Sequence, residues 1–366
     1  MKLSLSDTDI AIAPRSPFIQ RHEAIRTNGV AATAVAEVVR AIAPYLTADL
    51  ISPAHLTHLQ TIAGQLPGTL TNYFGFECRL GEVAPLADIL FCVRQVKYQP
   101  TVLAGLLPGI PEQWARQEPV WQQLRDFGQQ WASPTSLLIR KVQDIWLEFD
   151  VAGPPPPIPV PSLFFGSKVI HAGFPPEAHR WISQDAVRLL TGQPLTGPLQ
   201  HALLDCITAL PDRALLFQMG AMLSREPVFV RVCVSRLTPA TMPSYLEAVG
   251  WTGEWSRLTS LIDELTPFTE SFSLDLDLLE GKIGPKIGLE CGLQKDSNAA
   301  EWTPFLDYLV ARGLCLPGKR DGLLHYLAAG NGADGIERGL HHVKVVLQAG
   351  KPLQAKAYLS VVSEAA

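Results

Sequence analysis

Short runs of alternating apolar and polar residues follow longer runs with helical spacing along most of this chain. The clearest alternating run covers residues 271–278. Its apolar positions are Phe272, Leu274, Leu276 and Leu278, and its polar positions are Ser271, Ser273, Asp275 and Asp277. A period of two is typical of a β-strand with one apolar and one polar face. The run therefore predicts a strand that is buried on one side only.

The stretch 341–361 has the same alternation on both sides of a turn at residues 349–352 and predicts a β-hairpin. Its apolar face carries Val343, Val345, Leu347, Ala355, Ala357 and Leu359. Its polar face carries His342, Lys344, Gln348, Gln354, Lys356, Tyr358 and Ser360. Such a face is compatible with solvent, but it can also bind an anion. The neighbouring His341-His342 pair is interpreted as a surface pair.

Helical segments followed by a strand pair recur five times, at spacings of roughly 55 to 75 residues. The expected helices cover 31–45, 53–66, 120–131, 136–143, 181–190, 199–210, 244–249, 254–265, 302–313 and 320–327. The expected strands before the last hairpin cover 74–80, 89–93, 145–151, 162–166, 214–222, 228–237, 272–278 and 286–293. The glycine-rich segment 330–339 is predicted to be a flexible loop.

Strands that are apolar on one face exclude a doubly wound parallel sheet, because both faces of such a sheet are buried. Ten antiparallel strands can close into a barrel with apolar faces outward, under an outer ring of helices, and polar faces lining a lumen. The sequence thus predicts an α+β fold, a ten-stranded antiparallel β-barrel of five αββ repeats. Residues 26–366 would form this single domain, after an irregular lead-in at 1–25. Two α+β domains with open sheets are the alternative.

Composition adds limits to this fold. The 366 residues are 47% hydrophobic and 18% charged, with a net charge of -5, so bulk electrostatics gives no argument for binding nucleic acid or a membrane surface. The six cysteines lack metal-like spacing and suggest reduced, buried thiols. Asp7 and Asp9 interrupt any signal core, and no apolar run approaches 18 residues. We expect a cytoplasmic monomer or homodimer.

Alternation brings charges of both signs to the predicted lumen. The basic face and its tyrosine comprise Arg79, Arg94, Arg231, Lys344, Lys356 and Tyr358, a cluster large enough to hold a diphosphate. The acidic positions are Glu148, Asp150, Asp275, Asp277 and Glu290. These acids are compatible with a solvated strand face; inside a lumen they would weaken diphosphate binding unless Mg²⁺ bridges them, or would hold a cationic acceptor. Glu77 is either a base or an ion-pair partner.

The order of elements and three short motifs resemble the aromatic prenyltransferases of the αββα barrel type, in particular the indole-type members. The motifs are Phe76-Glu77-Cys78-Arg79, Phe91-Cys92-Val93-Arg94 and Lys356-Ala357-Tyr358. The resemblance implies a secondary-metabolism enzyme that moves an allylic group from a prenyl diphosphate to an aromatic or peptide acceptor by carbocation capture. It implies no required cofactor and no protein-bound metal, with Mg²⁺ as an option. The chain departs from the family pattern where acids replace basic pairs, around Glu148 and Asp275.

The resemblance also implies roles for individual residues. Glu77 would be the catalytic base toward the acceptor. The diphosphate would be bound by Arg79, Arg94, Arg231, Lys344 and Lys356. The cation shield and acceptor pocket would comprise Trp146, Phe164, Gln218, Tyr358, Glu148, Asp275, Asp277 and Glu290. A barrel that binds or modifies a cationic small molecule or peptide without prenyl transfer is the alternative function.

Overall fold

The computed structural model describes residues 34–67, 70–71, 73–94, 110–167, 170–171, 173, 175–195, 197–279, 281–293, 297–330 and 334–363. For residues 94 and 176 it describes only the backbone. The expected lead-in at 1–25 lies outside these ranges.

Ten strands close into one antiparallel barrel in the order β1-β10-β9-β8-β7-β6-β5-β4-β3-β2, so every strand pairs with its neighbours along the chain and β1 pairs with β10. The strands are β1 (Tyr73–Arg79), β2 (Ala87–Arg94), β3 (Asp144–Phe149), β4 (Ser162–Gly166), β5 (Leu215–Ala221), β6 (Val230–Leu237), β7 (Phe272–Leu279), β8 (Lys282–Cys291), β9 (Ile336–Leu347) and β10 (Gln354–Ser363). The predicted barrel is confirmed, and the alternative of two open sheets is wrong.

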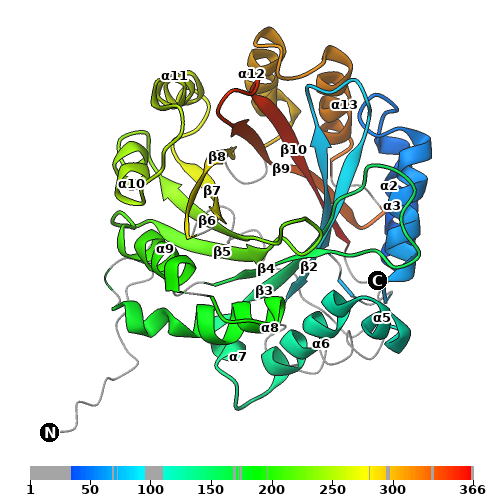
Figure 1. The fold of residues 1–366 in the computed structure, drawn as a ribbon. Coiled ribbons are helices and arrows are strands. Elements are labelled where there is room, and N and C mark those ends of the chain that lie inside the picture. Colours follow the sequence, from blue (N-terminus) through cyan, green and yellow to red (C-terminus); the bar gives the residue numbers. More distant parts are fainter. Residues whose placement is uncertain are drawn as a thin grey trace, which may run out of the picture.

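Helices surround this barrel on the outside (Figure 1). They are α2 (Val35–Ile42), α3 (Pro53–Gln65), α5 (Glu112–Gln117), α6 (Pro119–Ala132), α7 (Leu138–Lys141), α8 (Val187–Thr191), α9 (Gly197–Thr208), α10 (Met242–Ala248), α11 (Trp255–Leu265), α12 (Ala299–Ala311) and α13 (Pro317–Ala328). Short turns of other helix types, η1 (Ala43–Tyr45), η2 (Pro176–His179) and η3 (Ile182–Ala186), join some of them. The sequence pattern missed α5, and it made α7 too long because a serine-rich turn precedes it.

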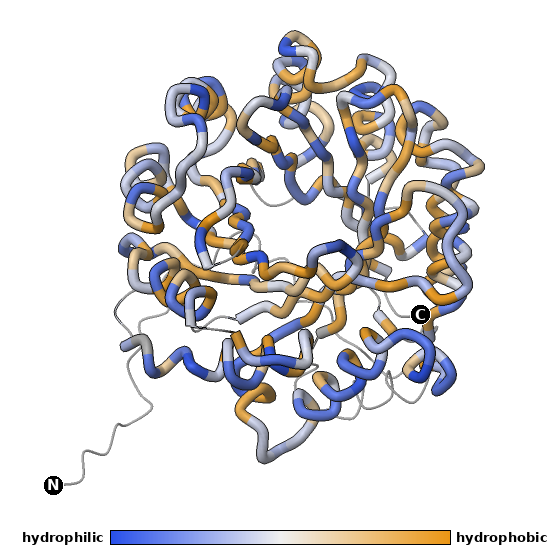
Figure 2. The backbone as a smooth tube through the Cα atoms, viewed as in Figure 1, coloured by the Kyte–Doolittle hydropathy of each residue, from blue (hydrophilic) through white to orange (hydrophobic). Residues whose placement is uncertain are grey.

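The hydrophobic core lies between the strands and the ring of helices. Val343 and Val345 on β9 and Leu274 on β7 have no exposed surface, because their outward faces pack into this core. Figure 2 shows hydrophobic and hydrophilic positions alternating along the strands. The apolar half of each strand thus attaches the barrel to its helices, and the polar half is left to form the lumen.

Close backbone contacts fix the seam between the first and last strands. Gly75 faces the backbone of β10, and a Cβ atom there would collide with the carbonyl oxygen of Leu359. Lys319 of α13 is buried and donates from Nζ to the carbonyl oxygens of Arg79, at 2.5 Å, and Ala84, at 3.1 Å. These contacts hold β1 against β10 and α13 at the point where the barrel closes.

Two expectations about the C-terminal unit are wrong. The segment 330–339, which was expected to be a loop, contains the start of β9. The strand begins at Ile336, where pairing with β10 starts, and Arg338 there is buried and ion-paired with Asp334. His342 is not a surface residue: it is only 6% exposed. His342 faces the lumen by the same alternation as Lys344. The register shift after Tyr358 leaves His341 as an extra residue of β9, which reaches the same cavity with its Nδ1 atom 2.7 Å from that of His342.

Candidate active site

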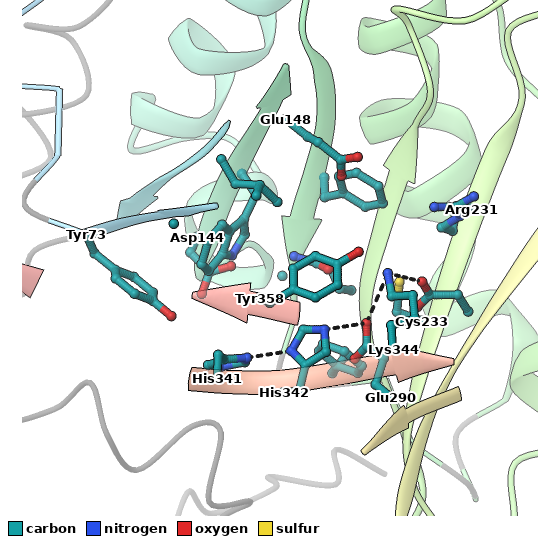
Figure 3. Close-up of a pocket in the computed structure, with 18 of the residues that line it drawn as sticks. Tyr73, Asp144, Glu148, Arg231, Cys233, Glu290, His341, His342, Lys344 and Tyr358 are labelled. Atoms are coloured by element: carbon teal, nitrogen blue, oxygen red, sulfur yellow. Dashed lines mark hydrogen bonds and ion pairs between the residues drawn. The ribbon is translucent and has the colours of Figure 1, made fainter. Parts of the chain in front are cut away.

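The lumen contains two adjoining cavities. The first, here called the aromatic cavity, measures about 160 Å³ and is lined by Tyr73, Trp146, Phe164, Phe217, Gln218 and Tyr358 among others. The second, here called the charged cavity, measures about 30 Å³ and lies toward the ends of the strands that are joined by hairpin turns. Five residues line both cavities: Glu148, Arg231, Asp275, Lys344 and Tyr358. Figure 3 shows how several of these side chains lie.

Glu77 lies in the charged cavity, where two residues of β10 bind its two oxygens. Lys356 Nζ forms an ion pair with Oε1, and Tyr358 Oη donates to Oε2. The carboxylate is only 2% exposed. Although burial alone would raise the pKa of Glu77, the nearby Lys356 and Lys344 outweigh it and leave this pKa far below its usual range. Glu77 is therefore ionised and held in place.

Arg231 and Lys344 are also paired. Arg231 Nε donates to Asp277 Oδ1 at 2.6 Å from the facing position on β7, in a forked contact. Lys344 Nζ lies 2.6 Å from Asp275 Oδ2 and 3.4 Å from Glu290 Oε1. Asp275 Oδ1 is buried and, within the described part of the chain, has no hydrogen-bond partner. The acids at 275, 277 and 290 thus face the lumen, as the alternation predicts.

Glu148 and Asp150 are bridged by an arginine that the sequence analysis did not single out. Arg225 Nη2 lies 2.8 Å from Asp150 Oδ1 and 3.3 Å from Glu148 Oε1. Ser224 Oγ adds a hydrogen bond to Asp150 at 2.9 Å. Arg225 lies in the turn between β5 and β6, where strand alternation gives no signal. The pairing of β4 with both β3 and β5 brings this turn to the end of β3.

Lys286 is a second lumen cation that was not singled out. It lines the charged cavity, and among the described residues it has no ion-pair partner. Burial is the main reason that its pKa is lowered. The sequence could have shown that Lys286 faces the lumen, because Lys286 and Glu290 are an even number of residues apart on β8 and so point to the same face of the strand. Lys286 is thus the most available cation of the described charged cavity.

Two acids of the lumen titrate at higher pH than usual. Burial, with a contribution from the charge of Glu77, raises the pKa of Glu148 to about 7. The same two causes raise the pKa of Asp88 to about 6, although Arg79 lies 3.1 Å away. The lumen therefore holds carboxylates whose pKa is lowered, Glu77 and Glu290 among them, together with Glu148, which gains and loses its proton near neutral pH.

Tyr358 separates the two cavities. Its ring stacks on His342 with centroids 4.1 Å apart, and Lys344 Nζ lies 4.6 Å from the ring centroid. His342 Nε2 also lies 3.4 Å from Glu290. The π face of Tyr358 is thus held rigidly beside a cation, which is a favourable contact for an aromatic ring.

The wall of the aromatic cavity is built by facing strands. Trp146 of β3 contacts Tyr73 edge to face with ring centroids 5.1 Å apart. Phe164 of β4 faces Trp146 in register and covers Gly220, where any Cβ atom would collide with the phenyl ring. An aromatic ring of a ligand could stack in this cavity, because apolar walls surround a space of suitable size.

Two predicted diphosphate contacts lie apart from the others. Arg79 is at the end of β1 and pairs with buried Asp88, outside both cavities. Arg94 is the last residue of β2, and its side chain lies outside the described part of the structure. Within the described residues, no group of three or more histidine, cysteine, aspartate or glutamate side chains could hold a metal ion. No helix in the described ranges is long and apolar enough to cross a bilayer.

No protein-family model matches the sequence, and no curated protein matches it either. The barrel, however, matches a solved structure of the prenyltransferase PriB with a TM-score of 0.57 at 12% identity, over 90% of this chain and 95% of that one. The chain has the fold of the aromatic prenyltransferases. This prenyltransferase barrel also matches 5-dimethylallyl tryptophan synthase from Streptomyces coelicolor, with a TM-score of 0.54 at 12% identity, over 92% and 96% of the two chains.

A third solved structure has the same prenyltransferase barrel. AnaPT from Neosartorya fischeri gives a TM-score of 0.52 at 14% identity, over 91% of this chain and 92% of that chain. PriB has also been solved with L-tryptophan and dimethylallyl thiolodiphosphate, and the Streptomyces synthase with DMASPP and Trp. At these identities the similarity establishes the fold, and the chemistry must be argued from this chain's own lumen.

Proposed function

We propose that this chain is an aromatic prenyltransferase, which transfers an allylic group from a prenyl diphosphate to an aromatic acceptor. The observation that carries the proposal is the division of one lumen into a charged and an aromatic cavity that meet at Tyr358. A diphosphate leaving group needs cations, and an allylic cation needs aromatic faces and protection from water. The two halves of the lumen supply these needs side by side.

The charged cavity would receive the diphosphate. Lys286 is its available cation, while Lys356 and Arg231 would exchange a carboxylate partner for a phosphate oxygen. A cavity of about 30 Å³ has room for about one water molecule, so the diphosphate binds only when such exchanges open it. Arg94 remains part of the proposal through its position on β2 alone.

The aromatic cavity would receive the acceptor and the allyl group. Ionisation breaks the bond between the allylic carbon and the diphosphate oxygen and leaves an allylic cation. The face of Tyr358 and the walls formed by Trp146 and Phe164 stabilise that cation and keep away water, whose lone pairs would otherwise react with it. The acceptor ring then attacks the cation and loses a proton. Gln218 is a polar contact for orienting the acceptor.

A second function is favoured by one observation. Five of the described basic residues of the lumen already have a carboxylate partner: Arg79, Arg225, Arg231, Lys344 and Lys356. A lumen whose bases are neutralised suits a cationic aromatic ligand, bound or modified without prenyl transfer. Asp275, with one oxygen unpaired among the described residues, is a candidate contact for that cation.

Product formation tests the first function against the second. The purified protein is incubated with dimethylallyl diphosphate and indole, L-tryptophan or a tryptophan-containing peptide, with and without Mg²⁺, and products are measured by mass spectrometry. We expect one acceptor to gain a dimethylallyl group. Lys286→Ala should raise the KM for the diphosphate at least about tenfold, as loss of a charge-assisted contact implies.

A matched control comes from the same strand. Lys282 is exposed at the start of β8 and does not line either cavity, so Lys282→Ala should leave KM unchanged. No product with any acceptor would contradict the proposal. If the protein were then stabilised by tryptamine but not by the diphosphate, the second function would hold instead.

A further inference from the structure

We infer that Glu148 takes the proton from the acceptor ring, and that Glu77 instead holds Lys356 and Tyr358 in position. The inference rests on the proposed function and assigns the proton transfer at that same site. It differs from the role that family resemblance gives to Glu77. Three features of the lumen lead to it: the contacts of Glu77, the location of Glu148, and the surroundings of Glu148.

Glu77 is poorly placed to receive a proton. Both of its oxygens already accept from Lys356 and Tyr358, and it lines the charged cavity but not the aromatic cavity. The ring of Tyr358 lies at the boundary between the two cavities. A carboxylate with two charge-assisted or phenolic donors is also a weak base. Glu77 therefore organises β10 and does not face the acceptor.

Glu148 lies where the acceptor must react. It lines both cavities, and on β3 it shares a face with Trp146, two residues earlier, on the wall of the aromatic cavity. Figure 3 shows its carboxylate above the Tyr358 ring. Among the described residues, Arg225 Nη2 lies 3.3 Å from Glu148 Oε1. The other carboxylate oxygen of Glu148 is left for a ligand.

The charges around Glu148 suit a base that works near neutral pH. The groups that act on it from the surrounding elements are Arg225, Arg231, Lys344, Glu77, Asp150 and Tyr358. Burial and the negative charge of Glu77 raise the pKa of Glu148 to about 7, against the attraction of Arg225. A base with such a pKa combines a useful ionised fraction with good proton affinity.

Bond formation and proton loss follow one another at the same carbon of the acceptor ring. The ring carbon of the acceptor uses a π electron pair to bond to the allylic cation. The Glu148 carboxylate then takes the proton from that carbon, and the electrons of the C–H bond restore the aromatic ring. The electrons of the cleaved C–O bond remain on the diphosphate, and Glu148 later releases its proton to solvent.

The test compares pH profiles of kcat and of kcat/KM for the wild type, Glu148→Gln, Glu148→Asp and Glu77→Gln, because kcat/KM reports the ionisation of the free enzyme. Dimethylallyl diphosphate is used with whichever of indole, L-tryptophan and the peptide the wild type prenylates fastest. We expect the wild type to lose activity below a midpoint near pH 7. Glu148→Gln should lower kcat at least about 100-fold and abolish this midpoint. Glu148→Asp should restore it. Glu77→Gln should retain a midpoint, at a lower rate and shifted to lower pH, because the negative charge of Glu77 that raises the pKa of Glu148 is lost.

Binding of dimethylallyl thiolodiphosphate, measured by calorimetry, separates catalysis from misfolding. Its Kd should change less than about threefold in Glu148→Gln. An active wild type whose Glu148→Gln variant keeps the pH midpoint and most of kcat would overturn this inference and leave the proposed function intact. A wild type that forms no product would overturn both.

Discussion

Replacing Glu77 by glutamine tests whether the barrel closes as described. The substitution keeps the shape of the side chain but leaves Lys356 Nζ without its carboxylate. Removing one partner of a buried ion pair typically destabilises a protein by about 3–5 kcal/mol. The Lys356 side chain is 24% exposed, so water partly solvates the remaining charge, and we expect a loss of about 3 kcal/mol.

The expected shift in melting temperature follows from the chain length. An unfolding entropy of about 2.1 cal/mol/K per residue over 366 residues gives about 0.8 kcal/mol/K, so 3 kcal/mol lowers the Tm by about 4 °C. Calorimetry or urea unfolding at pH 7 would measure this. Because the pKa of Glu77 is lower in the folded state than in the unfolded state, its contribution is full above about pH 4.5 and fades as the pH falls.

A matched control carries the same substitution at an exposed ion pair. Glu112 is 75% exposed and pairs with Arg116 one helical turn away on α5, so Glu112→Gln should change stability by about 0.5 kcal/mol or less. A Glu77→Gln protein within about 1 kcal/mol of the wild type at pH 7 would refute the reasoning. A stability difference that did not shrink in acid would refute it as well.

Three other substitutions have defined outcomes in unfolding measurements. Gly75→Ala should destabilise by about 2 kcal/mol or more, because its Cβ would meet the backbone at Leu359, whereas Gly64→Ala in α3 has open space around it and should stabilise by about 0.5–1 kcal/mol. A destabilised Gly64→Ala or a neutral Gly75→Ala would contradict this. Glu148 has a pKa of about 7 in the folded state and about 4.5 in the unfolded state. The stability of the wild type should therefore fall as the pH rises from about 4.5 to about 7. Glu148→Gln should lack that fall and gain about 3–4 kcal/mol relative to the wild type above pH 7; parallel pH curves would exclude a raised pKa.

The fold could be predicted because strand alternation needs only local sequence. Residues such as Leu274 and Asp275 alternate between the core and the lumen, and this pattern recurs in each unit. The start of β9 was missed because Gly335 and Gly339 resemble loop residues, although Arg338 is buried between them. Asp334, the ion-pair partner of Arg338, is only four residues away, but local pattern cannot show that Arg338 also lies over the distant ring of Tyr45.

The candidate site was predictable as a set of inward-facing residues but not as a set of pairs. Glu77 and Lys356 are 279 positions apart in the sequence, and only closure of β1 on β10 joins them. Arg225 was missed because it lies in a turn, where no periodicity applies. The roles of the carboxylates depend on such pairs, so the sequence left Glu77 as either a base or an ion-pair partner until its partners were placed.

The most direct measurement of the central claim is a titration with dimethylallyl thiolodiphosphate, followed by thermal unfolding with and without Mg²⁺. A ligand present at 100 times its Kd stabilises by about 2.7 kcal/mol, which for 366 residues raises the Tm by about 3–4 °C. We predict a shift of this size in the wild type that grows with the logarithm of the ligand concentration, and a smaller shift in Lys286→Ala. A Tm that stays constant at millimolar ligand under both conditions would contradict a diphosphate site in the charged cavity.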